Sequence, residues 1–243
     1  MKNILAMSDL HGRIPKLPRV ITSSEIDVLI LAGDIAGHGK ENWTYTDYFE
    51  RMVNVPAEAI YQKAWIENTL KPWIDKEVKP KSVIFVNGNH DFGDYEGVFE
   101  HYLFMGSKTI AIDGVKIGLL AGSGILVNEW SDEINEDQFS QRIDGIERDV
   151  TYLISHVPPH GILDKAHNGD RIGSRALTQA IFGRIGTEPY FTNLKYSIFG
   201  HCHENRGKEE HEIDGRKITF LNVAETFATL DEHKGTRVSF HSK

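Results

Sequence analysis

Short apolar runs rich in β-branched residues recur along this chain of 243 residues, and they constrain its fold more than any other feature. Each run is apolar at consecutive positions, whereas a strand with one face in water alternates apolar and polar residues. Each is bounded by glycine or polar residues, which is typical of a short strand buried on both faces. The runs predict an α/β fold with parallel strands and helices outside them. They are NILAM (3–7), DVLILAG (27–33), SVIFVNG (82–88), KIGLLAG (116–122), TYLISH (151–156), YSIFGH (196–201) and ITFLNVA (218–224).

The segments between these runs predict helices on the outside of the sheet. Apolar residues recur at helical spacing over residues 55–78, and we expect a break near Pro72 because proline interrupts helical hydrogen bonding. Residues 132–149 and 174–185 are also expected to be helical. Two Asp-Gly pairs lie between extended segments and predict hairpin turns, because glycine tolerates the positive φ that such turns require. The pairs are Asp113-Gly114 and Asp214-Gly215.

Two polar segments are expected to leave the core. Residues 38–52 are polar and aromatic and predict a long excursion, and residues 168–176 predict a second, glycine-rich one. No internal repeat, low-complexity tract or linker interrupts the sequence. We therefore expect a single domain over residues 1–243.

Composition excludes several classes of protein. Lys and Arg number 27 against 35 Asp and Glu, a net charge of −8, which disfavours a general nucleic-acid binder because such a protein needs a basic face. The single cysteine cannot form an internal disulfide, which fits a reducing compartment. The first apolar stretch is too short for a secretory signal, and no stretch approaches the roughly 20 apolar residues of a membrane helix. We expect a soluble cytoplasmic protein with no membrane partner.

Polar residues with metal-binding side chains follow five of the apolar runs, at the point where each run ends. Ligands of α/β sheets bind outside the carboxyl ends of the strands, so these side chains are expected to meet at one edge. Taken singly, each residue has an ordinary explanation, such as a helix cap, a turn or a hydrogen-bonded histidine. Their shared position behind five separate runs makes coincidence a poor explanation. The set comprises Asp9, His11, Asp34, Asn89, His156, His201 and His203.

The chemistry of this set indicates transition metals. Two carboxylates, one amide and four imidazoles are hard-to-borderline ligands that suit Mn, Fe, Zn, Ni or Co. Seven groups are too many for one tetrahedral ion but suffice for two ions if one carboxylate bridges, and two ions roughly 3.5–4 Å apart can activate water for displacement at phosphorus. Cys202 has no second cysteine for a zinc knuckle or a redox pair, and we expect it to pack behind the site. Seven further histidines are not assigned to metal: His38, His101, His160, His167, His211, His233 and His241.

Five motifs within residues 7–203 carry a resemblance to a known family. They read SDLHG, LAGD, NGNHD, LISHVPP and FGHCHE, and together they resemble the calcineurin-like metallophosphoesterase superfamily. The resemblance implies a four-layer α-β-β-α sandwich of two mixed sheets flanked by helices. It also implies a phosphoesterase in which a hydroxide that bridges two divalent metal ions, Mn above all, attacks phosphorus.

The same resemblance implies a role for each motif residue. His90 would lie near the metals without binding them, contact the phosphate and protonate the leaving oxygen. Asp91 would hold the His90 ring in place and favour its acid form, with a helix N-cap as the alternative role. The metal ligands would divide into Asp9, His11 and His203 for the first ion and Asn89, His156 and His201 for the second, with Asp34 bridging both.

A narrower resemblance concerns residues 156–174, HVPPHGILDKAHNGDRIGS. This segment is similar to the small phosphodiesterase branch of the superfamily, which includes cyclic-nucleotide phosphodiesterases. It makes His160, Arg171 and Arg175 candidate contacts for an anionic substrate, and solvated loop residues are the alternative.

The leading hypothesis is a dinuclear metal-dependent phosphoesterase that acts on small phosphodiesters. A DNA nuclease and a phosphomonoesterase or nucleotide pyrophosphatase are the rivals within the superfamily, so nucleic acid would be a substrate and not a regulatory partner. A non-catalytic protein-binding scaffold is the alternative of another class. Scaffolds of this kind lack part of the metal or acid set, and this chain keeps all five motifs.

Overall fold

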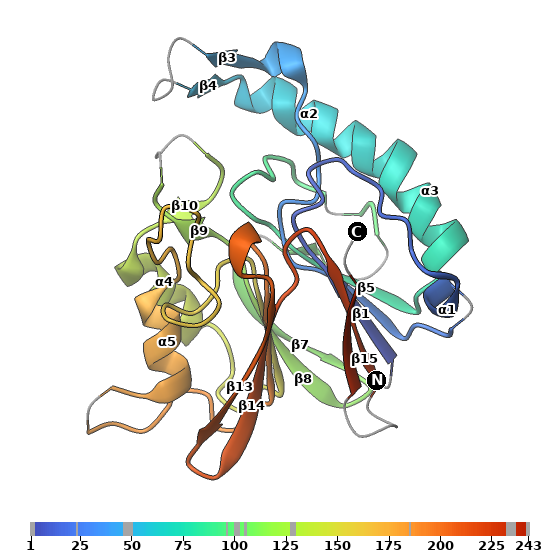
Figure 1. Ribbon diagram of the computed structural model, residues 1–243. Coiled ribbons are helices and arrows are strands. Elements are labelled where there is room, and N and C mark those ends of the chain that lie inside the picture. The colour runs from blue at the N-terminus through green and yellow to red at the C-terminus, as the bar shows by residue number, and fades with distance from the viewer. Residues whose placement is uncertain are drawn as a thin grey trace.

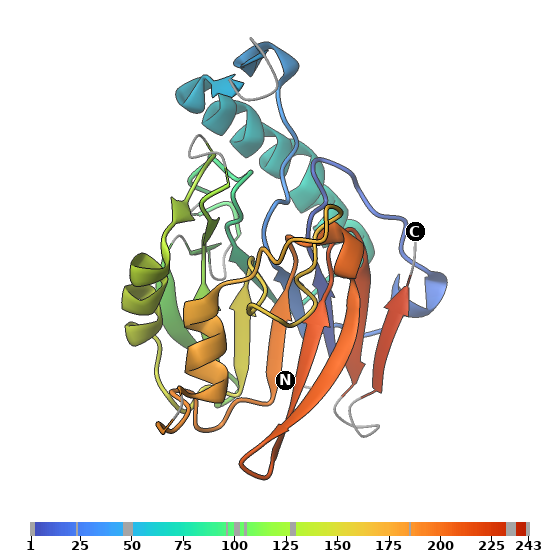
Figure 2. The same ribbon diagram turned by 60° about the vertical axis from the view of Figure 1, so that its left-hand side comes forward.

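Two six-stranded mixed sheets form the centre of the protein in a computed structural model, which describes residues 3–22, 24–45, 51–95, 97–99, 103–104, 106–126, 130–184, 186–231 and 237–241. The first sheet has the order β16 (Arg237–His241), β15 (Phe227–Asp231), β1 (Asn3–Met7), β2 (Val28–Leu31), β5 (Ser82–Val86) and β6 (Leu103–Phe104). The second has the order β13 (Gly207–Ile213), β14 (Arg216–Asn222), β12 (Tyr196–Phe199), β11 (Tyr152–Ser155), β8 (Val115–Leu120) and β7 (Ser107–Ile112). Figures 1 and 2 show the two sheets facing each other.

The seven apolar runs become seven parallel strands of these sheets. In the first sheet β1, β2, β5 and β6 are parallel, and β15 and β16 continue it in antiparallel fashion. In the second sheet β14, β12, β11 and β8 are parallel, while β13 and β7 form antiparallel edges. Both edge strands belong to hairpins, and the φ values at their Asp-Gly turns are positive, between 49° and 77°. The two predicted hairpin turns are therefore confirmed.

Each central strand is buried on both faces. On the faces between the sheets, Ile4 and Ile30 belong to the same apolar cluster as Ile154 and Ile198. On its outer face, the first sheet packs against the helical segment 55–78, and the second sheet packs against helices α4 (Glu136–Asp144) and α5 (Arg175–Phe182). The layers are thus helix, sheet, sheet and helix, and the predicted four-layer fold is confirmed.

Residues 55–78 form one continuous helical segment, so the break expected near Pro72 does not occur. The segment passes through α2 (Val55–Trp65), a π-helical turn (66–70), α3 (Lys71–Trp73) and a second π-helical turn (74–78). The helical segment ends at Lys79, whose φ is 51° and whose N–H donates to Ile74 O. A π-helical turn bonds five residues back, so its wider ring accommodates proline without ending the helix.

The other helices are shorter than predicted. Asn135 caps α4 through a reciprocal pair of hydrogen bonds with Gln138, so the helix begins there and not at residue 132. The residues before the cap form the short strand β10 (Glu133–Ile134), which pairs with β9 (Ser123–Gly124). Ser174 caps α5, which ends at Gly183. The remaining short helix, α1, spans Arg19–Thr22.

The predicted excursion 38–52 projects beyond the sheets at the start of α2 (Figure 1). It contains a 3₁₀ turn (Lys40–Asn42) and the hairpin β3 (Trp43–Tyr45) and β4 (Arg51–Val53), and its residues 46–50 lie outside the described ones. The other predicted excursion, 168–176, is irregular up to the start of α5. Within the described ranges, no helix has the length and apolar character needed to cross a bilayer.

Candidate metal centre

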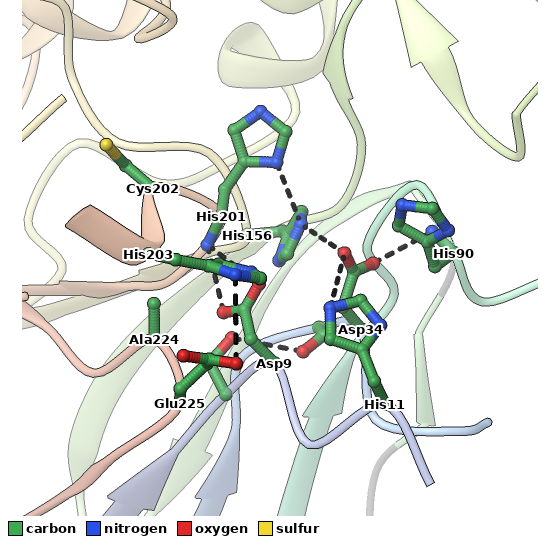
Figure 3. A network of polar contacts seen from close by, with 12 residues as sticks. Asp9, His11, Asp34, His90, His156, His201, Cys202, His203, Ala224 and Glu225 are labelled. Carbon is green, nitrogen blue, oxygen red and sulfur yellow. Dashed lines mark hydrogen bonds and ion pairs between the residues drawn. The ribbon is translucent and has the colours of Figure 1, made fainter. Parts of the chain in front are cut away.

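The carboxyl ends of strands from both sheets meet at one site (Figure 3). The turns that follow β1, β2 and β12 leave the extended conformation abruptly, because Asp9, His11, Asp34 and His201 all have φ between 45° and 67°. A left-handed conformation is uncommon for residues other than glycine and is found disproportionately at functional sites. The turns support one another, since Asp9 N–H donates to Gly33 O at 2.9 Å and His11 N–H to Asp34 O at 3.0 Å.

Three motif glycines make room for the converging side chains. A Cβ at Gly33 would lie 2.4 Å from His156 Nδ1, and one at Gly88 would lie 2.2 Å from Asp34 Oδ1. A Cβ at Gly200 would lie 2.1 Å from Asp9 Oδ2. All three distances are far shorter than an ordinary contact, so the motifs need glycine at these positions for steric reasons.

Asp9, His11 and His203 form the first candidate ligand group. One donor atom of each lies within 4.8 Å of the other two, and His203 Nε2 is 2.9 Å from Asp9 Oδ1. The Asp9 carboxylate also accepts the backbone N–H of His201 at 3.0 Å. His11 Nε2 lies 3.9 Å from Asp34 Oδ2, which brings the predicted bridging carboxylate to the side of this group.

The second candidate group is centred on His156. Its Nδ1–H donates to Ala32 O at 2.9 Å, which turns Nε2 towards the site. Three of the predicted ligands lie at similar distances from that nitrogen: Asn89 Oδ1 at 3.2 Å, His201 Nδ1 at 3.2 Å and Asp34 Oδ2 at 3.3 Å. The structure therefore brings together all seven residues that the sequence selected, with Asp34 between the two groups.

The two buried carboxylates of the site, Asp9 and Asp34, favour a cation beside them. Burial opposes a charged His156, but Asp34 outweighs that effect and raises the pKa of His156 to about 10. Burial, together with the neighbouring His156, lowers the pKa of His201 to about 3. Burial also opposes ionisation of Asp34 and Asp9, yet their histidine neighbours hold the pKa of each below its ordinary value. Buried carboxylates, imidazole lone pairs and an amide oxygen are a donor set that fits divalent transition metals.

His90 lies beside the two groups, but the structure gives Asp91 a different role from the expected one. The Asp91 carboxylate accepts backbone N–H groups from Asp34 at 2.6 Å and Gly88 at 2.9 Å, and Oδ1 accepts that of Ile35 at 3.1 Å. Asp91 thus ties the β2 loop to the β5 loop through its backbone contacts, and the helix N-cap alternative does not apply because residues 89–95 contain no helix. Burial and the charge of Asp34 raise the pKa of Asp91 to about 7.

The His90 ring packs against Trp130, with 4.4 Å between ring centroids, and forms a hydrogen bond with His38, which sequence reasoning left without a role. His38 Nε2 is 3.0 Å from His90 Nδ1, and His38 Nδ1 is 2.9 Å from Glu58 Oε1. Burial lowers the pKa of His90 to about 4, although Asp34 acts in the opposite direction. The spacing offered one signal, since His38 follows Asp34 by four residues in the same loop.

Glu225 is a second residue that sequence reasoning missed. It follows the apolar run 218–224, so the rule that selected the other site residues would have found it. Its φ is 50°, and its Oε1 lies 3.9 Å from His203 Nδ1 and 3.8 Å from the guanidinium of Arg13. Arg206 lies 3.7 Å from Oε2, so the carboxylate connects a candidate ligand with two partly exposed cations.

The three predicted substrate contacts lie in or next to the loop between β11 and α5. Arg171 donates to the buried Asp164 at 2.6 Å, and His160 N–H donates to Ser174 O. The backbone N–H of Arg175 donates to Glu136, at the start of α5. These contacts hold the loop in place, and contact with a substrate stays a prediction for all three.

Cys202 packs behind the site as expected. It is fully buried, and its carbonyl accepts the side-chain N–H of Asn222 at 2.8 Å. Burial raises the pKa of its thiol to about 11, which disfavours the reactive thiolate. Figure 3 shows its sulfur turned away from the carboxylates and imidazoles.

Comparisons with known proteins identify a family and several similar chains. The sequence profile of the calcineurin-like phosphoesterase family matches residues 2–205. UPF0046 protein K07C11.7 of Caenorhabditis elegans is 24% identical over 247 residues, which cover 91% of this chain and 69% of that protein. A second protein of that organism, UPF0046 protein T07D4.2, is 32% identical over 82 residues, or 33% of this chain and 19% of the other. One solved structure aligns over 99% of this chain and 98% of its own, with a TM-score of 0.66 and 16% identity, which is a likeness of fold.

Proposed function

The chain belongs to the calcineurin-like phosphoesterase family, and from this premise we propose that it is a dinuclear metal-dependent hydrolase of small phosphodiesters. One observation carries the proposal: Asp34 lies between two converging ligand groups, 3.9 Å from His11 on one side and 3.3 Å from His156 on the other. A carboxylate in that position can serve two ions at once.

Asp9, His11 and His203 would hold one ion, Asn89, His156 and His201 the other, and Asp34 both. Such ions stabilise negative charge at phosphorus and lower the pKa of water. We expect Mn²⁺ to support activity, because carboxylate, amide and imidazole donors suit it as well as they suit Fe, Zn, Ni or Co.

His90 would donate the proton that the leaving oxygen needs. Its Nδ1 faces His38, so Nε2 is the nitrogen that remains for a substrate. Its backbone N–H donates to Asp34 Oδ1 at 2.8 Å, which keeps the residue beside the bridging carboxylate. A bound phosphoester brings negative charge close to the ring, and that charge favours the protonated form against the effect of burial.

The net charge of the protein supports a small substrate over a long nucleic acid. A chain with a net charge of −8 lacks the overall basic character that supplies affinity for nucleic-acid backbones. Small phosphodiesters, cyclic nucleotides among them, need only the metal centre and a few neighbouring groups. A nuclease, a phosphomonoesterase and a nucleotide pyrophosphatase are the alternatives that the assay has to separate.

The experiment combines metal analysis with a substrate panel. The purified protein is stripped with a chelator, reloaded with Mn²⁺, Ni²⁺ or Co²⁺ and analysed for bound metal. The panel contains a bis-aryl phosphate, an aryl phosphate, 2′,3′- and 3′,5′-cyclic nucleotides and single-stranded DNA. We expect about two ions per chain and metal-dependent cleavage of the diesters. A protein that binds no metal after loading, or that cleaves only DNA or only monoesters, would refute the proposal.

A further inference from the structure

We infer that Glu58 and His38 are positioning residues that orient the ring of His90, an inference that rests on the proposed function of His90. Both come from the segment between β2 and β5, and Glu58 lies on α2 with a fully buried side chain. The chain Glu58–His38–His90 is continuous, with heavy-atom distances of 2.9 Å and 3.0 Å.

The surroundings of Glu58 determine the direction of these hydrogen bonds. Its side chain is completely buried, and donors surround its two oxygens. Oε2 accepts the backbone N–H of Gly39 at 3.2 Å and a side-chain N–H of Asn42 at 2.9 Å, while Gln62 Nε2 lies 3.4 Å from Oε1. A carboxyl group that receives donors on every side is an acceptor. His38 Nδ1 must therefore carry a hydrogen and donate it to Glu58.

This direction fixes the tautomers of both histidines. A neutral imidazole that donates through one nitrogen accepts through the other, so in its neutral form His38 presents its Nε2 lone pair to His90. His90 Nδ1 must then be the donor in the 3.0 Å contact. Nε2 of His90, on the opposite side of the ring, is left as the nitrogen that exchanges a proton with a substrate.

Helix α2 also holds the backbone of the same loop. Gln62, one turn after Glu58, donates from Nε2 to the carbonyl of His90 at 2.7 Å. Its Oε1 accepts the N–H of Phe92 and the hydroxyl of Tyr95, both at 2.7 Å. Residues four apart lie on one face of a helix, so a single face of α2 fixes both the ring and the main chain of His90.

This arrangement explains why the Asp91 carboxylate can serve the backbone instead of the ring. The two residues that orient His90 flank the predicted excursion, His38 at its start and Glu58 just after its end. The excursion 38–52 therefore has a structural role, because it brings the chain back so that Glu58 lies against His38.

The first test observes the tautomer directly and needs neither metal nor turnover. Long-range ¹H–¹⁵N spectra of the metal-free protein distinguish Nδ1–H from Nε2–H imidazoles. We expect both His38 and His90 to be Nδ1–H tautomers in the wild type. In His38→Ala we expect His90 to lose its exclusive Nδ1–H form. A wild-type His90 that carries its hydrogen on Nε2 would overturn the inference.

The second test compares variants at saturating Mn²⁺, with metal content measured on the same samples. His38→Ala should lower kcat by about 10–100-fold for an alkyl leaving group, by analogy with the loss of hydrogen-bond partners of metal-binding histidines, and leave KM near the wild-type value. The loss should be smaller for a nitrophenyl ester. His38→Gln retains an acceptor for His90 Nδ1 and should recover part of the loss.

A matched control is available on the far edge of the second sheet. His211 pairs with Glu209 at 3.1 Å and has a similar exposure, 36% against 29% for His38. His211→Gln should leave kcat and both tautomers unchanged. Equal losses for the alkyl and nitrophenyl esters in His38→Ala, or no loss at all, would overturn the inference. If the wild type cleaves no phosphoester, the proposed function fails, whereas the tautomer result still decides whether His38 and Glu58 orient the ring.

Discussion

Replacing Gly88 with alanine tests how tightly the backbone of the site surrounds its bridging carboxylate. The added Cβ would lie 2.2 Å from Asp34 Oδ1, 2.8 Å from Asp34 N and 2.8 Å from His156 Cδ2. Reaching an ordinary contact of 3.4 Å requires a relative shift of roughly 1.2 Å at the carboxylate. Asp34 cannot turn away freely, because it accepts the N–H of His90 and its own N–H donates to Asp91.

The size of the effect follows from that displacement. Overpacking of this kind costs about 1–3 kcal/mol of the free energy of unfolding, or a few degrees of Tm for each kcal/mol in a chain of this length. The backbone adds no penalty, since Gly88 is not among the glycines with positive φ. A misplacement of about 1 Å at a reacting centre costs about 10²-fold in rate, and we expect at least that loss in kcat for Gly88→Ala.

Gly124→Ala is the matched control. Gly124 also lacks a positive φ, and nothing lies within 4 Å of a Cβ built there. Metal affinity is measured by titrating Mn²⁺ into the stripped proteins, kcat at saturating Mn²⁺, and Tm with and without metal. Gly88→Ala should bind Mn²⁺ about 10–100-fold more weakly than the control. If Gly88→Ala kept the Mn²⁺ affinity, kcat and Tm of Gly124→Ala, the steric argument would be wrong.

Three other perturbations probe the same site. Asp34→Asn should reduce metal content and kcat more than His203→Asn does, because Asp34 faces both ligand groups; equal metal losses in elemental analysis would contradict a bridging role. His90→Asn should retain metal and lose about 10²–10⁴-fold in kcat with a cyclic nucleotide, but less with a nitrophenyl ester, whose leaving group departs readily as an anion; metal loss would make His90 a ligand instead. The Tm of the chelated protein should fall as the pH rises from 6.5 towards 10, because Asp34 raises the folded pKa of His156 from 6.5 to about 10. The stabilisation is complete below pH 6.5 and is lost progressively as the pH approaches 10. Bound Mn²⁺ takes the place of that proton, so the decline should be weaker with metal, and a flat Tm in the chelated protein would contradict the sign.

The central strands and the metal ligands could be predicted from sequence for one physical reason. Strands that are buried on both faces must be apolar at consecutive positions, and the end of each such run is visible as the first polar residue. The sequence therefore places five residues at strand ends even though it does not show which strands are neighbours. They are Asp9, Asp34, Asn89, His156 and His201. Strand β15 lies between β1 and β16, and its sequence FATLD is not apolar at consecutive positions, so the sequence predicts neither β15 nor the edge strand β16.

The contacts of His90 could not be predicted, because they depend on the spatial return of a distant segment. Glu58 is 32 positions before His90 in the chain, and nothing in the helical pattern of α2 distinguishes a buried carboxylate from an exposed one. The resemblance predicts that Asp91 faces the ring of its neighbour His90, but adjacent residues point in different directions. The carboxylate oxygens of Asp91 instead accept N–H groups that the left-handed turn at Asp34 exposes.

The site draws its residues from both sheets. The first sheet supplies Asp9, His11, Asp34 and Asn89, and the second supplies His156, His201 and His203. If ions occupy both groups, they add cross-links between two layers that already meet through apolar contacts and through hydrogen bonds such as that of His156 to Ala32. Because such ions would bind only the folded protein, a higher metal concentration would raise its free energy of unfolding. A shortage of metal would therefore lower the free energy of unfolding of the domain that holds the site.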